Sequence, residues 1–86
     1  MMPNIDKTKR RQIQRNILLK YRPSISATND EIAIAAGTSL ESVRRTMLGV
    51  QAHPGVLMVL RRLFLEVPEW GGVLPYDLYS FITDPR

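Results

Sequence analysis

Residues 28–45 read TNDEIAIAAGTSLESVRR, and this stretch decides the fold. Its first residues predict a helix start, because Thr28 followed three residues later by Glu31 matches a capping box. The helix that follows, Asn29–Ala36, is expected to be short and is rich in alanine. It is expected to stop at Gly37, since glycine is the residue type best suited to a left-handed helix end.

A second short helix is expected directly after this turn. Ser39 is placed to cap it, because a serine side chain can accept a hydrogen bond from the amides of the first helical turn. The helix is expected to run from Leu40 to about Leu48, and Gly49 is expected to close it. Two short helices would therefore be separated by a turn of about three residues centred on Gly37.

The spacing of small and apolar residues fits two helices that cross closely. Ile32 and Ala36 are expected to face inward from the first helix, and Val43 from the second. Ala33 lies four residues before Gly37 and is small enough for the crossing point. This arrangement is the helix-turn-helix plan, with residues 29–48 as the unit.

Residues 28–45 resemble the helix-turn-helix segment of the lac-repressor and lambda Cro/repressor families, which reads T-x-x-x-V-A-x-x-A-G-V-S-x-x-T-V-S-R. The resemblance covers less than a quarter of the chain. Two positions depart from it: Thr38 replaces the usual turn valine, and Thr46 replaces an apolar residue late in the second helix. The resemblance implies DNA binding. The expected five-helix layout is more similar to Cro and lambda-type repressors than to the lac family.

The N-terminal part of the chain predicts a helix from about Ile5 to Tyr21, ended by Pro23. Its apolar residues recur at helical spacing and form one stripe, made of Ile13, Ile17, Leu18 and Tyr21. Its polar and basic residues lie mainly off that stripe; they are Lys9, Arg10, Arg11, Gln14 and Arg15.

The C-terminal part predicts two more helices. Pro54 is well placed in the first turn of a helix to about Val67, ended by Pro68; this helix is apolar on most sides and is expected to be the most buried element. His53 is interpreted as a loop or cap residue. A last helix is expected over about Pro75–Thr83. Trp70 is interpreted as a core or interface anchor, and either the core or a dimer interface is expected to take the apolar side chains of this region, Leu74, Leu78, Tyr79, Phe81 and Ile82.

Composition narrows the class of protein. The chain has 86 residues, enough for one domain (1–86), with a possible dimerisation segment over 70–83. It has no cysteine and one histidine, so no disulfide framework and no zinc site are expected. No membrane span, cofactor or metal is expected, and no constellation of catalytic residues is visible, so an enzyme is not expected. The default compartment is the cytoplasm.

Charge favours a polyanionic partner. The formal net charge is +4 and the sequence pI is near 10.0. With double-stranded DNA as partner, the residues expected to contact bases are Leu40, Glu41, Arg44, Arg45 and Leu48. By the resemblance, Leu40, Glu41 and Arg45 match base-contacting positions of the lac family. The residues expected to contact phosphate are Lys9, Arg10, Arg11, Arg15, Thr28, Asn29, Ser39 and Ser42.

Each of these assignments has a simpler alternative. Glu41 and Arg45 lie four residues apart and can simply pair on the helix surface. Leu40 can belong to the core, and any single basic residue can contribute only to the overall positive electrostatic field of the protein.

The function expected from these features is a sequence-specific transcriptional regulator, a repressor that acts as a homodimer on an operator. By analogy with Cro-like proteins, the small size fits a protein of phage, plasmid or other mobile-element origin. One alternative is a DNA-maintenance accessory factor for partition or a relaxosome. A third possibility is a protein-binding helical adaptor of the antitoxin type.

Overall fold

The computed structural model describes residues 3–83 and contains five α-helices and no strand within that range. The helices are α1 (Pro3–Tyr21), α2 (Asn29–Ala36), α3 (Leu40–Met47), α4 (Pro54–Leu65) and α5 (Tyr76–Thr83). A 3₁₀ turn follows α1 and another precedes α5, at Arg22–Ser24 and Pro68–Trp70. The expected all-helical fold with five helices is confirmed for these residues.

The helix ends follow local chemistry. The capping box is formed as expected: the Glu31 amide donates to Thr28 Oγ1 at 3.1 Å, and the Thr28 amide donates to Glu31 Oε1 at 2.8 Å. His53 caps α4, since its Nδ1 accepts a hydrogen bond from the Val56 amide at 3.3 Å. α4 ends at Leu65, two residues earlier than expected, because Val67 precedes Pro68 and is held in an extended conformation.

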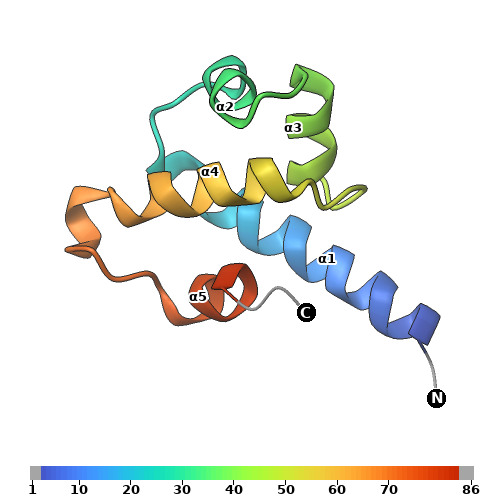
Figure 1. Cartoon of the computed structure of the whole chain (residues 1–86). Coiled ribbons are helices and arrows are strands. Elements are labelled where there is room, and N and C mark those ends of the chain that lie inside the picture. The colour runs from blue at the N-terminus through green and yellow to red at the C-terminus, as the bar shows by residue number, and fades with distance from the viewer. Residues whose placement is uncertain (1–2, 84–86) are drawn as a thin grey trace.

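Helix α4 lies between the α2–α3 pair and α5, while α1 crosses behind it (Figure 1). One side of α4 buries Val56, Leu60 and Phe64 completely, and these residues meet side chains from the other helices in one core. The opposite side carries Met58, which is 67% exposed, so α4 is less enclosed than its composition predicts. The other fully or nearly buried apolar residues of the core are Leu18, Ile25, Ile32, Ala33, Val43, Met47, Leu74 and Leu78.

Helix α1 differs from the expected pattern in two positions. Ile13 was expected in the apolar stripe but is 44% exposed, whereas Gln14, expected off the stripe, is buried. Leu18 lies in the core, four residues after Gln14 and on the same side of the helix. The hydrogen bonds of the Gln14 amide offset the free-energy cost of burying a polar side chain.

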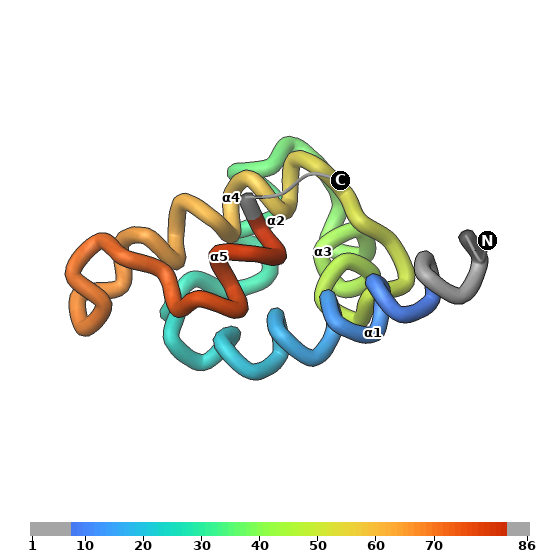
Figure 2. The backbone as a smooth tube through the Cα atoms, turned by 90° about the horizontal axis from the view of Figure 1, so that it is seen from below, coloured from blue at the N-terminus to red at the C-terminus, as the bar shows by residue number. Residues whose placement is uncertain are grey.

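A polar cluster joins α5 to the end of α1, and Figure 2 shows the two helices side by side. Tyr21 donates to Asp77 Oδ1 at 2.7 Å, and Lys20 Nζ lies 3.2 Å from Asp77 Oδ2. The hydrogen bond from Tyr21 lowers the pKa of Asp77, with further lowering from Lys20 and the Leu78 amide. The same hydrogen bond raises the pKa of the Tyr21 hydroxyl. Trp70 packs edge-on against Tyr21 and stacks near Phe64, as expected for a core anchor.

Candidate nucleic-acid interface

The turn between α2 and α3 is a Schellman motif. Gly37 has a φ of +67°, its amide donates to the Ile34 carbonyl at 3.1 Å, and the Thr38 amide donates to the Ala33 carbonyl at 3.0 Å. Ser39 then caps α3, since its Oγ accepts from the Ser42 amide at 3.2 Å. The sharp bend at Gly37 therefore makes α2 and α3 separate helices, as expected.

Helix α3 has one buried and one exposed side. Val43, Thr46 and Met47 are buried, and the charged residues lie on the other side. Thr46 is fully buried, and its Oγ1 accepts a hydrogen bond from the His53 amide at 3.3 Å. A threonine at this position is thus compatible with burial, because its hydroxyl group is hydrogen-bonded.

The exposed side of α3 carries most of the residues expected to contact bases. Glu41, Arg44, Arg45 and Leu48 are all exposed, while Leu40 is half-buried. Glu41 makes two ion pairs: its Oε2 lies 3.3 Å from Arg45 Nε, and its Oε1 lies 3.9 Å from Arg44 Nη1. Glu41 and Arg45 therefore pair on the helix surface in the free protein, which is the simpler alternative to a role in base contact.

Three hydrogen bonds and one close backbone approach join α1 to the C-terminal end of α3 and the turn that follows it. Gln14 Nε2 donates to the carbonyls of Thr46, at 2.7 Å, and of Gln51, at 2.8 Å. Arg11 Nη1 donates to the Val50 carbonyl. Gly49, whose φ is +77°, lies so close to α1 that a Cβ there would be 2.3 Å from the Arg11 carbonyl oxygen. Together these contacts hold the exposed side of α3 at a fixed orientation.

The basic residues of α1 are divided between different sides of the molecule. Arg11 and Arg15 lie beside the end of α3, through the contacts at Val50 and Gly49. Arg10 instead lines two hollows with α5 residues such as Phe81. Lys9 lies five residues before Gln14, about 140° away around the helix, on the side that faces away from α3. The structure thus brings two of these four residues to the candidate interface.

The remaining phosphate candidates are polar groups at helix starts. Thr28, Ser39 and Ser42 all take part in capping hydrogen bonds. Asn29 Oδ1 accepts from Arg22 Nη2 at 2.9 Å, which leaves the Asn29 Nδ2 group to donate. Arg22 also donates to the Ile25 and Ala27 carbonyls and so shapes the segment before α2.

Sequence reasoning missed Gln14 and Arg22. A signal existed for Gln14, because it lies three and four residues before Ile17 and Leu18 on the same side of α1. For Arg22 no such signal exists, since its partners are carbonyls in an irregular segment.

Comparisons with protein-family models, with curated protein sequences and with solved structures find no match to the chain. Among residues 3–83, no helix combines the length and apolar character that crossing a membrane requires. Among the side chains of residues 8–82, no cluster of three or more histidine, aspartate or glutamate residues is arranged to hold a metal ion.

Proposed function

We propose that this protein is a sequence-specific DNA-binding transcriptional regulator with a lambda-repressor-like helix-turn-helix domain, acting in the cytoplasm as a homodimeric repressor. The observation that supports it most strongly is the two-sided character of α3. Val43, Thr46 and Met47 are buried, and the other side exposes Arg44 and Arg45 on a short helix that follows a tight glycine turn. A helix of this kind fits the major groove of B-DNA.

In this proposal Arg45 or Arg44 reads guanine through two hydrogen bonds to O6 and N7. Leu48 is exposed at the end of α3 and would contact a thymine methyl group. Arg11 and Arg15 lie beside the same helix end and would contact phosphates, which orient the protein and make its affinity depend on salt. Occupation of the operator would block the polymerase sterically.

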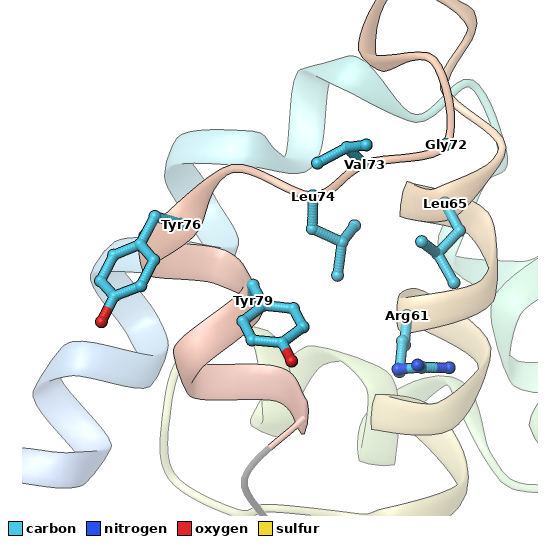
Figure 3. A pocket seen from close by; sticks show the side chains of 7 residues that line it. All are labelled: Arg61, Leu65, Gly72, Val73, Leu74, Tyr76 and Tyr79. Carbon is cyan, nitrogen blue, oxygen red and sulfur yellow. The ribbon is translucent and has the colours of Figure 1, made fainter.

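A second copy of the chain would be needed to read two half-sites. The apolar residues of the segment expected to dimerise are divided between the core and the surface. Leu74 and Leu78 belong to the core, and Phe81 and Ile82 are half-buried. Tyr76 is 82% exposed and Val73 70% exposed, beside a hollow of about 500 Å³ between α4 and α5. In Figure 3, Leu65, Leu74 and Tyr79 converge on this hollow while Tyr76 points outward. This surface is the candidate dimer contact.

The same exposed surface favours a protein-binding adaptor as the second candidate function. Sedimentation equilibrium distinguishes the two candidate functions, because it gives the mass of the purified protein for the wild type and for Tyr76→Asp. A wild-type dimer that dissociates in Tyr76→Asp supports the homodimer. A wild-type monomer that selects no DNA sequence supports the adaptor.

DNA reading is tested by selection from a library of random-sequence duplexes, followed by affinity measurements on the selected site. Arg45→Ala is expected to weaken binding by about 1–3 kcal/mol and to relax specificity at one base pair. Arg62→Ala is the matched control, because Arg62 is exposed near the end of α4 that points away from α3 (Figure 1). Unchanged affinity in Arg45→Ala would show that α3 is not the reading helix.

A further inference from the structure

Glu41 is an acidic residue in the middle of a surface proposed to bind a polyanion. Its carboxylate lies between two arginines and approaches both, and its side chain is 56% exposed. A phosphate backbone repels a carboxylate at this position, so an acid here needs a role that outweighs that repulsion.

The atoms of the Arg45 contact indicate that role. Glu41 Oε2 lies 3.3 Å from Arg45 Nε, the inner nitrogen of the guanidinium. A guanidinium carries five N–H donors in a planar fork, so an acid placed at Nε leaves both terminal nitrogens to donate to another acceptor. Those two nitrogens are the ones suited to paired hydrogen bonds with guanine O6 and N7.

The Arg44 contact is looser and involves a different atom. Glu41 Oε1 lies 3.9 Å from Arg44 Nη1, a terminal nitrogen of the kind that binds phosphate as well as bases. At this distance the two groups attract each other without a hydrogen bond, so a phosphate would compete with the carboxylate for the charge of Arg44. Glu41 therefore opposes binding that depends only on charge, while it leaves the paired donors of Arg45 available.

We propose that Glu41 sets the DNA specificity of α3: it orients Arg45 through Nε for guanine and weakens attachment to DNA that lacks the guanine. This inference rests on the proposed DNA-reading function. It makes Glu41 a positioning and specificity-determining residue, not a direct reader of cytosine.

The test compares Glu41→Gln with the wild type on the duplex selected by the wild type and on a random-sequence duplex of equal length. Loss of two exposed ion pairs and of one repelled charge is expected to raise affinity for random DNA about threefold to fivefold. The ratio of specific to random affinity is expected to fall by at least about fivefold, and a repeated selection is expected to lose preference at the guanine contacted by Arg45.

Glu66→Gln is the matched control, because it makes the same change in net charge at an exposed position at the far end of α4 from α3 (Figure 1). It is expected to leave the affinity ratio within about twofold, since charges separated by more than a Debye length of about 8–10 Å are largely screened. Equal effects of the two substitutions would overturn the proposal, as would an unchanged ratio in Glu41→Gln. Loss of preference at a cytosine alone would also overturn it in favour of direct reading. If the wild type selects no sequence, the proposed function itself fails.

Discussion

Two glycines flank α3. Comparing the free energy of unfolding after each is replaced by alanine measures how much the close approach of α1 to one of them constrains the fold. Gly37 and Gly49 have similar left-handed backbone angles, with φ of +67° and +77°. A Cβ at Gly37 would meet no atom within 4 Å, whereas a Cβ at Gly49 would lie 2.3 Å from the Arg11 carbonyl oxygen and 3.2 Å from Arg15 Cβ. Both substitutions therefore place an alanine in a left-handed backbone conformation, but only Gly49→Ala also creates a steric clash with α1.

The magnitudes follow from these two terms. A left-handed conformation costs an L-residue about 1–2 kcal/mol, so Gly37→Ala is expected to lower the free energy of unfolding by about that amount. Gly49→Ala adds the displacement of α1 backbone, for which overpacking costs of about 1–3 kcal/mol apply. We expect a total loss of about 2–5 kcal/mol for Gly49→Ala.

The assay is urea denaturation of both variants followed by circular dichroism, with thermal melting in parallel. A loss of 1 kcal/mol corresponds to about 4–8 °C in a domain of this size, so the two variants should be clearly separated. Equal losses in the two variants would refute the reasoning, because they would show that α1 and the α3–α4 turn do not approach as closely as the structure places them.

Three further substitutions test other contacts. Thr28→Ala removes the cap of α2 and is expected to cost about 1 kcal/mol of unfolding free energy in urea, while a change within error would mean that the capping box contributes nothing. Gln14→Ala removes one buried and one partly buried hydrogen bond of about 1 kcal/mol each, so a loss of about 2 kcal/mol is expected by the same assay; a much smaller loss would indicate that water replaces the amide. Because the pKa of Asp77 is lowered by folding, its ionised form stabilises the fold above the unfolded pKa of about 3.9, and this stabilisation is lost as pH falls through the lowered pKa. Asp77→Asn should therefore flatten the acid side of a stability–pH profile, and an unchanged profile would contradict this account.

The sequence by itself determined the features that depend on neighbours within about four residues. The capping box at Thr28, the left-handed glycine at position 37, the cap at Ser39 and the end of α1 before Pro23 are all found as expected, whereas α4 ends two residues earlier than expected. These features are readable because helix hydrogen bonds and caps join residues three or four positions apart. The bounds of α2 were predicted to the residue for this reason.

Only the tertiary structure decided how α1 and α5 are placed around this unit. Gln14 bonds to carbonyls 32 and 37 residues away, and Tyr21 bonds to Asp77 across 56 residues. No local pattern encodes such pairs, because they depend on which side of each helix packs inward. For the same reason the sequence listed four basic residues of α1 as equal candidates, while the packing of α1 against the end of α3 places only Arg11 and Arg15 beside α3.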